Sequence, residues 1–413
     1  MNSWATPATP TLGKIRELPA LVLTDTATTT KKALAKKSMY RMYVCGITPY
    51  DATHLGHAAT YLTFDLINRY LRATGAEVLY VQNITDIDDP LLERANRDGL
   101  DWSDLAHQQI DLFKGDMVDL RVIPPAHYIG AVEAIPLVVK AISDLQEQAS
   151  VYSVDTDHYF AVKSDSRFGS RSNLSHNEML EIFSQRGGDP DRVGKIDPLD
   201  CLVWMSQRVN EPGWESILGT GRPGWHIECT AIALEYLDPS DLDAELIDIQ
   251  GGGSDLIFPH HEMCAAQAHV ITGKELASTY VHAGMIGLDG EKMSKSKGNL
   301  VFVSRLVASG VDPMAIRWAL MLDHYRSDRM WSDSILHKAQ DELALLKDAL
   351  SRNTSAPTED LIESIVSAIS DDLDTPLVLS HLNAWAALTR EGSHGGNSED
   401  LRIALDALLG LKL

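Results

Sequence analysis

The chain has little cysteine and no long apolar run, and each absence narrows the class of protein. Only four of its 413 residues are cysteine, which excludes a scaffold held by many disulfides. No run of 18 apolar residues occurs, so we expect no membrane-spanning helix. The first residues lack the basic and apolar regions of a signal peptide. We therefore expect a soluble, cytoplasmic protein of about two or three domains.

Positive charge is also in short supply. The 36 lysines and arginines stand against 58 aspartates and glutamates, which gives a formal net charge of −22. Such a balance disfavours a broad nucleic-acid surface, although a local basic patch stays compatible with it. Residues 301–413 carry 10 lysines and arginines and 17 aspartates and glutamates, whereas a surface for an RNA stem should show a basic stripe. The composition favours a globular protein without a large nucleic-acid interface.

Strand and helix patterns alternate over much of the chain and predict an α/β fold. We expect a Rossmann-like, doubly wound parallel sheet that is split by an insertion and followed by an all-α C-terminal bundle. No internal repeat is visible. The predicted parts are an N-terminal extension (1–38, partly disordered over 26–32), the first half of the sheet (39–125), the insertion (126–220), the second half (221–300) and the helical bundle (301–413).

Two histidines follow the first predicted strand of this sheet. The sequence His54-Leu55-Gly56-His57 lies between a short strand at 42–46 and a helix that begins near residue 58. A helix N-terminus after a strand binds anions, because its free N–H groups and its dipole point at the loop. His54 and His57 can donate hydrogen bonds to phosphate, and Gly56 lets a base or ribose lie against the backbone. Two structural histidines in a turn are the alternative for this segment alone.

A second phosphate-binding candidate lies about 235 residues downstream, at Lys292-Met293-Ser294-Lys295-Ser296. Two ammonium groups on a mobile loop can close over a triphosphate and offset the charge that grows on departing pyrophosphate. A lysine-rich run by itself usually means a solvated loop. Together, however, the two motifs resemble the split signature of class I enzymes that activate a carboxylate as an aminoacyl adenylate. We therefore expect ATP, with Mg²⁺, as a co-substrate.

Three cysteines and one histidine could form a metal site, namely Cys45, Cys229, His260 and Cys264. His260 and Cys264 are four residues apart and share one face of a helix, as metal ligands need. Thiolates with imidazole favour zinc over harder ions. The spacing matches no compact zinc finger, so tertiary structure would have to assemble the site. Buried cysteines without a metal remain the alternative, and Cys201, in an apolar segment, is expected to pack in the core.

Six segments of the chain resemble the cysteinyl-tRNA synthetase family of class I enzymes: 43–46, 54–58, 83–89, 221–229, 251–262 and 292–296. The resemblance implies that L-cysteine is activated as cysteinyl adenylate and that zinc is held by Cys45, Cys229 and His260. A zinc position open to the substrate thiolate would explain selectivity, because an apolar pocket rejects the isosteric serine only by roughly two orders of magnitude.

The resemblance also implies roles for further residues. The catalytic set comprises His54, His57, Lys292 and Lys295. The expected ATP contacts are Gly56, Gly253, Ser254, Asp255, Ile286, Ser294 and Ser296. The expected contacts to cysteine or its adenylate are Thr48, Thr60, Asn83, Thr85 and Trp225. Turn or capping roles for the polar members of this last set, and core packing for Trp225, remain alternatives.

The chain departs from the synthetase pattern in three places. Cys264 stands where the synthetases carry a glutamate ligand, and we expect it near the metal but not as an obligatory ligand. Residues 46–50 read Gly-Ile-Thr-Pro-Tyr where the synthetases usually read Gly-Pro-Thr-Val-Tyr. Arg186-Gly187-Gly188-Asp189-Pro190 resembles a signature of the paralogous ligases of mycothiol biosynthesis, which join cysteine to the amine of glucosaminyl-inositol.

The length of the C-terminal region favours the same paralogues. Residues 297–413 accommodate a helical bundle but not the additional anticodon-reading module of the synthetases. We expect a monomeric ligase that uses L-cysteine, ATP and glucosaminyl-inositol, without tRNA or a membrane. A short cysteinyl-tRNA synthetase and a non-catalytic paralogue that binds nucleotide or cysteine are the alternatives. The complete histidine and lysine motifs weigh against the second alternative.

Overall fold

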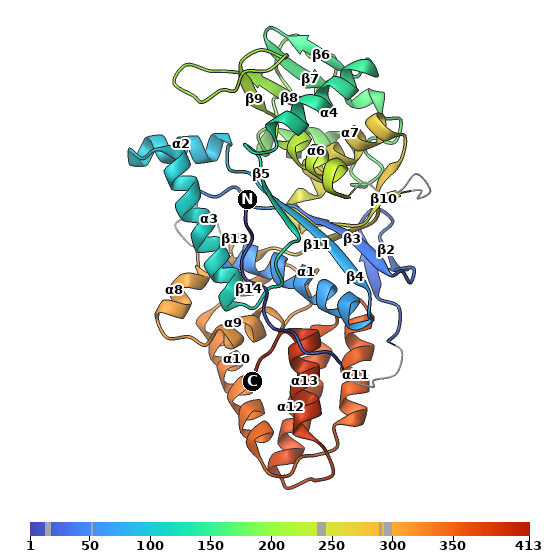
Figure 1. Cartoon of the computed structure of the whole chain (residues 1–413), viewed down its shortest axis with the longest axis vertical. Helices are drawn as coiled ribbons and strands as arrows, with labels where there is room; N and C mark the ends of the chain where they lie inside the picture. The colour runs from blue at the N-terminus through green and yellow to red at the C-terminus, as the bar shows by residue number, and fades with distance from the viewer. Residues whose placement is uncertain (13–17, 51–52, 238–244, 289–290, 293–299) are drawn as a thin grey trace.

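The structure is a computed structural model that describes residues 1–12, 18–50, 53–237, 245–288, 291–292 and 300–413. Figure 1 shows a central sheet with a smaller sheet and its helices above it and a helical bundle below it. The predicted fold class, a parallel α/β sheet followed by a helical region, is confirmed. No helix among the described residues is long and apolar enough to span a membrane.

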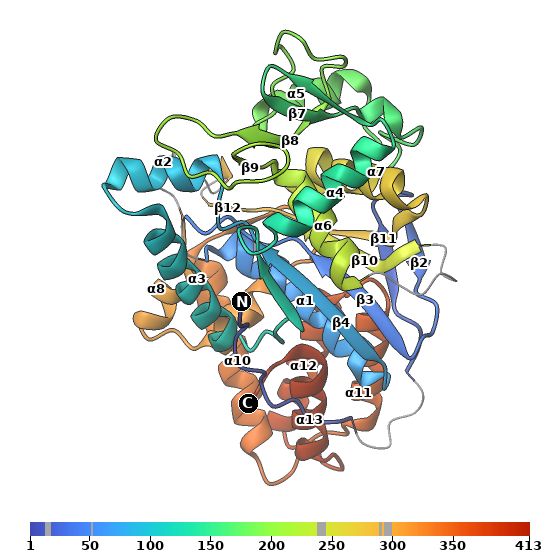
Figure 2. The same cartoon turned by 45° about the horizontal axis from the view of Figure 1, so that its top comes forward.

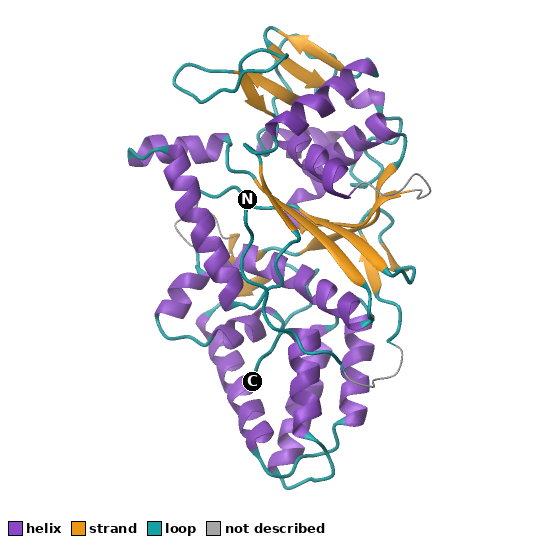
Figure 3. Ribbon diagram, in the orientation of Figure 1, coloured by secondary structure: helices purple, strands orange, loops and turns teal. Residues whose placement is uncertain are grey.

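The central sheet has five parallel strands in the order β11-β10-β3-β4-β5. Figure 3 draws the strands of the molecule in orange and its helices in purple. Their bounds are β3 Met39–Val44, β4 Glu77–Ile84, β5 His127–Gly130, β10 Glu245–Gly253 and β11 Glu275–Ala283. Strand β5 lies within the range predicted as the insertion, 126–220, and pairs in parallel with β4 as the edge strand of the central sheet. A strand of four residues directly after Pro124-Pro125 gives too short a pattern to recognise. The name insertion is used below for residues 131–223, up to the end of β9 Gly221–Pro223.

Helices cover both faces of this sheet (Figures 1 and 2). On one face lies α1 (Leu55–Ala73), which has an apolar stripe and is capped by His54. On the other face lie α6 (Trp225–Leu237) and α7 (Glu262–Thr272), and α4 (Ile135–Glu147) packs against both of them. The loops that carry the predicted functional residues therefore emerge at the carboxyl edge of the strands, where α/β sheets bind ligands.

The insertion contains an antiparallel sheet in the order β6-β7-β8-β9, which its own helices cover. The elements of this part are β6 Val151–Val154, β7 Asp157–Phe160, η1 Val162–Ser164, α5 His176–Gln185, β8 Cys201–Ser206 and β9 Gly221–Pro223. Cys201 is buried in the core of this part, as predicted. Strand β9 leads directly into α6, so the insertion returns the chain to the carboxyl edge of the central sheet.

Below the sheet, α9–α13 form the bundle, which a fully buried ionic cluster joins to α1. Asp65 accepts hydrogen bonds from Arg69 and Arg317, and all three side chains are fully buried. The remaining elements are α2 Asp89–Asp98, α3 Trp102–Asp119, η2 Ser254–Leu256, η3 Ile257–His261, β12 Ile286–Leu288, β13 Glu291–Lys292, α8 Val303–Ala308, α9 Pro313–Leu320, β14 Arg329–Trp331, α10 Asp333–Ser351, α11 Glu359–Ser370, α12 Thr375–Arg390 and α13 Ser398–Leu409.

The N-terminal segment is ordered where disorder was expected. Strands β1 (Val22–Asp25) and β2 (Thr30–Ala33) form a hairpin, so the prediction for 26–32 is wrong. The hairpin docks on β11, because Thr26 donates its N–H to the carbonyl of Tyr280 at 2.8 Å and Asp25 Oδ1 accepts from Tyr280 N–H at 2.9 Å. Its run of threonines and lysines looks like a solvated tail, but these bonds and others to distant residues, such as that from Thr24 to Asp372, fix its position.

Candidate active site

A pocket of about 370 Å³ opens at the carboxyl edge of β3 and β10, within the size range of small-molecule sites. Eight of the predicted site residues line it together with the predicted ligand Cys45: Thr48, His54, Gly56, His57, Thr60, Trp225, Gly253 and Asp255. The sequence analysis did not assign the other lining residues, which are Gly46, Ile47, Tyr50, Tyr61, Leu256, Met285 and Leu300. The expected phosphate, ribose and cysteine contacts thus meet around one space.

The two histidines of the first motif stack on each other at the start of α1. Their ring centroids are 3.7 Å apart with an interplanar angle of 27°. His54 Nδ1 accepts a hydrogen bond from the Gly56 N–H at 3.1 Å, so a neutral His54 carries its proton on Nε2 and can donate it to an anion. Burial and the neighbouring His54 lower the pKa of His57 well below its usual value, which keeps that ring neutral. The pair can therefore donate hydrogen bonds to phosphate.

Gly56 is needed at this position because of how close it lies to His54. A Cβ atom on Gly56 would lie 2.9 Å from Cε1 of the His54 ring. Any side chain at residue 56 would push that ring away from the stacked arrangement.

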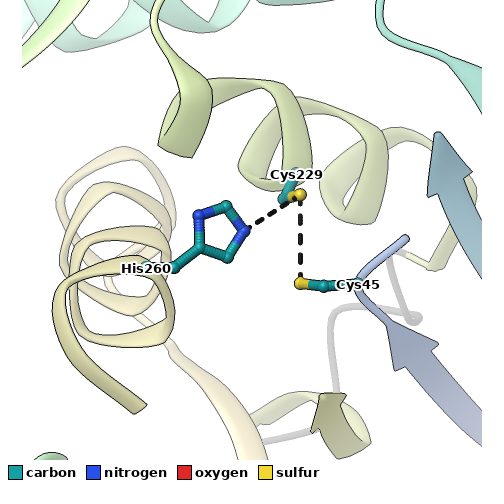
Figure 4. Close-up of side chains that lie close together, drawn as sticks. All are labelled: Cys45, Cys229 and His260. Carbon is teal, nitrogen blue, oxygen red and sulfur yellow. Dashed lines mark hydrogen bonds between the residues drawn. The ribbon is translucent and has the colours of Figure 1, made fainter. Parts of the chain in front are cut away.

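Cys45, Cys229 and His260 form a buried cluster behind the pocket (Figure 4). Cys45 follows β3, Cys229 lies in the second turn of α6, and His260 lies just before α7. One ligand atom from each lies within 4.8 Å of the others. The Sγ atoms of Cys45 and Cys229 are 3.9 Å apart, and His260 Nε2 is 3.2 Å from Cys229 Sγ. Three separate parts of the chain thus present soft ligands to one point.

The dimensions and chemistry of this cluster fit zinc. Two thiolates bound to zinc at 2.3 Å with tetrahedral angles would lie about 3.8 Å apart, close to the observed sulfur separation. Burial tends to raise the pKa of Cys229, but hydrogen bonds from Cys264 and Cys45, together with His260, outweigh it and lower the pKa well below the usual value. Cys229 is therefore the thiol of the cluster that loses its proton most readily. Burial and Cys229 raise the pKa of Cys45, whose proton a metal would displace.

Cys264 lies beside this cluster but outside the group of three. Its Sγ donates a hydrogen bond to the carbonyl of His226 at 3.3 Å. Burial and a hydrogen bond to Cys229 raise the pKa of Cys264 well above its usual value. A protonated thiol engaged with a carbonyl is consistent with the expectation that Cys264 lies near the metal without being an obligatory ligand, which stays a prediction.

Three further histidines surround the cluster, and sequence reasoning missed them. His226 Nδ1 is 2.9 Å from His260 Nδ1, so it orients the ring whose Nε2 faces Cys229. His261 Nε2 is 3.3 Å from Cys45 Sγ, and His261 Nδ1 is 2.7 Å from His282 Nε2. His226 and His261 stand next to recognised motif residues, which was a usable signal, whereas His282 reaches the site only through the pairing of β10 with β11.

The remaining predicted contacts have different places. Asn83 Oδ1 accepts from the Gly46 N–H at 2.8 Å, and Asn83 Nδ2 donates to Thr85 Oγ1 at 3.2 Å, so these buried side chains tie the ends of β3 and β4 together. Trp225 stacks on His260 with centroids 4.4 Å apart and joins the pocket wall to the cysteine and histidine cluster.

Several predicted residues are not part of the pocket wall. Ser254 and the buried Ile286 do not line the pocket. Lys292 ends β13, but its side chain, together with Ser294, Lys295 and Ser296, lies outside the described residues.

Comparison with known proteins places this site in a family. The tRNA synthetases class I (C) catalytic domain matches residues 31–341. A curated protein of Kribbella flavida, named L-cysteine:1D-myo-inositol 2-amino-2-deoxy-alpha-D-glucopyranoside ligase, is 56% identical over 374 residues, which is 90% of each chain. A protein of the same name from Streptomyces avermitilis is 51% identical over 418 residues and covers 100% of each chain.

Solved structures show the same fold at low identity. The Mycobacterium tuberculosis methionyl-tRNA synthetase in complex with methionyl-adenylate superimposes with a TM-score of 0.64 over 90% of each chain, at 16% identity. The chain belongs to the class I (C) tRNA synthetase catalytic domain family, in which its curated relatives are ligases.

Proposed function

We propose that this protein is an ATP-dependent, AMP-forming ligase that joins L-cysteine to the amine of glucosaminyl-inositol through a cysteinyl adenylate. One observation carries the proposal: Cys45 of the soft-ligand cluster lines the same pocket as His54 and His57. A pocket with phosphate-binding histidines at one end and a thiol-selective cluster at the other suits a cysteine that is activated with ATP. The identity of the acceptor is inferred from the names of the relatives, which share about half of their residues with this chain.

In the first step, the carboxylate of cysteine attacks the α-phosphorus of ATP and pyrophosphate leaves. His54 and His57 donate hydrogen bonds to the phosphates, and Lys292 and Lys295 offset the charge that develops on pyrophosphate. Asp255, whose side chain lines the pocket next to Gly253, accepts from a ribose hydroxyl. A Cβ at Gly253 would lie 2.7 Å from Asp255 Oδ1, so this glycine leaves the carboxylate accessible.

In the second step, the neutral amine of the acceptor attacks the adenylate carbonyl, the amide bond forms and AMP leaves. Cys45, Cys229 and His260 would hold zinc, and their two thiols and one imidazole are the ligands that this metal prefers. When bound, zinc supplies a soft Lewis-acid position that a cysteine thiolate fills well and a serine hydroxyl fills poorly. His226 keeps the His260 ring in the orientation that this site needs.

The proposal includes a monomer that acts in the cytoplasm and takes no tRNA. The deciding experiment offers the purified enzyme, ATP and cysteine either glucosaminyl-inositol or tRNA and follows the formation of amide or aminoacyl ester. We expect amide formation with glucosaminyl-inositol and no loading of tRNA. Loading of tRNA without amide formation would establish the short synthetase instead, and the absence of both products together with the absence of adenylate would favour a non-catalytic paralogue.

A further inference from the structure

A charged and aromatic surface adjoins the pocket near Tyr50 and Trp225. It is formed by the N-terminus of α2, the loop between β8 and β9, and the start of α6. Asp88 and Asp89 lie where α2 begins, shortly after the carboxyl end of β4. Arg222 lies in β9, three residues before Trp225 of the pocket wall. We call this the α2–β9 surface.

The α2–β9 surface is continuous with the pocket. Tyr50, which lines the pocket, packs with Trp102 against one apolar cluster of α2 and α3. Trp102 and Trp214 pack against a second cluster that contains Ile87, the neighbour of Asp88. Their rings meet edge to face with centroids 6.2 Å apart, and both are half-buried. Tyr50 thus links the aromatic rings of this surface to the pocket lining.

Carboxylates dominate the charge of this surface. Arg222 donates Nη2 hydrogen bonds to Asp89 and, at 3.5 Å, to Glu211. Its charge also acts on Asp88 and on Glu228, the residue before Cys229. Burial raises the pKa of Asp88 to about 6, so its carboxyl is still ionised near neutral pH. A cationic amine is the ligand that such an arrangement attracts.

Two buried polar atoms here lack a hydrogen-bond partner among the described residues. Glu228 is 1% exposed and its Oε2 has no partner, while the Arg222 side chain is 5% exposed and its Nε has none. Buried polar atoms in folded proteins are nearly always satisfied, so these two atoms can each take a further hydrogen bond from a polar group that reaches them. An acceptor with many hydroxyl groups supplies the missing donors and acceptors.

We propose that the α2–β9 surface is the acceptor site, where Asp88 receives the amine of an amino sugar and Trp214 and Arg222 hold the polyhydroxylated rings. This rests on the proposed function and adds the place of its second substrate. Asp88 follows β4 and Cys45 follows the neighbouring strand β3, so both residues lie at the carboxyl edge of the central sheet, where α/β folds bind their ligands.

The test compares Asp88→Asn, Trp214→Leu and the control Glu93→Gln, an exposed carboxylate on the same helix α2. Asparagine caps a helix as well as aspartate does, so Asp88→Asn keeps the start of α2 intact and removes only the charge. Pyrophosphate exchange, which needs no acceptor, reports adenylate formation. Ligation reports the acceptor KM.

We expect Asp88→Asn to keep cysteine-dependent exchange within about twofold and to raise the KM for glucosaminyl-inositol by roughly tenfold or more, as loss of a charged hydrogen bond does. The inhibition constant of the N-acetylated acceptor, which has no ammonium, should not change in this variant. Trp214→Leu should raise both the KM for glucosaminyl-inositol and the inhibition constant of its N-acetylated form, and should leave pyrophosphate exchange unchanged. Glu93→Gln should match the wild type in all three measurements.

An unchanged acceptor KM in Asp88→Asn would overturn the assignment, and so would a parallel loss of exchange, which would place Asp88 in adenylate formation or in folding. Failure of the proposed function looks different. In that case the wild-type enzyme itself performs exchange but makes no amide with glucosaminyl-inositol, before any variant is compared.

Discussion

Arg186, at the end of α5 in the insertion, donates a hydrogen bond from Nη1 to the main-chain oxygen of Asp255, the proposed ribose contact. The same nitrogen donates to the carbonyl of Phe258, two residues before His260. The guanidinium therefore fixes the short turn that connects the nucleotide contact to the proposed metal ligand. Arg186 is the first residue of the segment 186–190, whose sequence by itself indicated only a family signature.

Replacement of Arg186 with Met should raise the KM for ATP in pyrophosphate exchange several-fold and lower the zinc content per chain, because both ends of the turn lose an anchor. The expected loss of stability is about 1–3 kcal/mol for two partly buried carbonyls left without a donor. Arg186→Lys should recover only part of this, since a single ammonium does not reproduce the geometry of a guanidinium. An Arg186→Met enzyme with wild-type ATP kinetics and full zinc would show that the turn is held by other contacts.

Cys45, which belongs to the cluster, and Cys264, which lies beside it, should behave differently towards metal. Cys45→Ser should lose zinc after dialysis, because Cys45 is one of the three converging ligands. Cys264→Ser should keep near-stoichiometric zinc and most activity, because the Cys264 thiol already donates to the His226 carbonyl. Metal analysis of both purified variants checks this. Loss of zinc from both would mean that the fourth metal position is not open to substrate.

Asp116 should make folding stability depend on pH. It is 1% exposed on α3, beneath the residue before His54, and burial raises its pKa to about 7, with the Thr53 hydroxyl offsetting part of that rise. The pKa of Asp116 is higher in the folded state than in the unfolded state. Its protonated carboxyl group therefore stabilises the fold fully below about pH 4, and this stabilisation is lost as the pH rises through 7.

Asp116→Asn removes that loss, so its free energy of unfolding relative to the wild type should rise by about 2–4 kcal/mol between pH 4 and pH 8. Urea unfolding at several pH values measures the difference. Asp111→Asn, which changes an exposed carboxylate on the same helix, is the control and should show no such trend. A flat difference for Asp116→Asn would mean that Asp116 has an ordinary pKa.

The parts of the fold with strong periodicity were predictable from the sequence. The helix after His54, the strand β4 and the C-terminal helices all follow apolar patterns that packing then preserves. The hairpin at 22–33 and β5 were not predictable, because short polar strands are stabilised by partners distant in the sequence. Contacts with distant residues determine whether such strands form, and the local sequence pattern does not predict them.

The candidate site, too, was only partly predictable from the sequence. Cys45, Cys229 and His260 could be selected by residue type and family resemblance, and the structure brings them together from three parts of the chain. Of the histidines around them, His226 and His261 stood beside motif residues and were overlooked, whereas only the pairing of β10 with β11 brings His282 to the site. Asn83, in β4, and Thr85, just after it, hold the ends of β3 and β4 together through hydrogen bonds. The sequence motif does not reveal this structural role.

The central claim is that the enzyme forms cysteinyl adenylate before any acceptor binds. The most direct measurement is the exchange of labelled pyrophosphate into ATP by the purified, zinc-loaded enzyme, with cysteine, serine or no amino acid and without any acceptor. We predict exchange that depends on cysteine and is lower with serine by far more than the roughly hundredfold that an apolar pocket alone provides. Exchange that requires glucosaminyl-inositol or tRNA, or that serine supports as well as cysteine does, would contradict it.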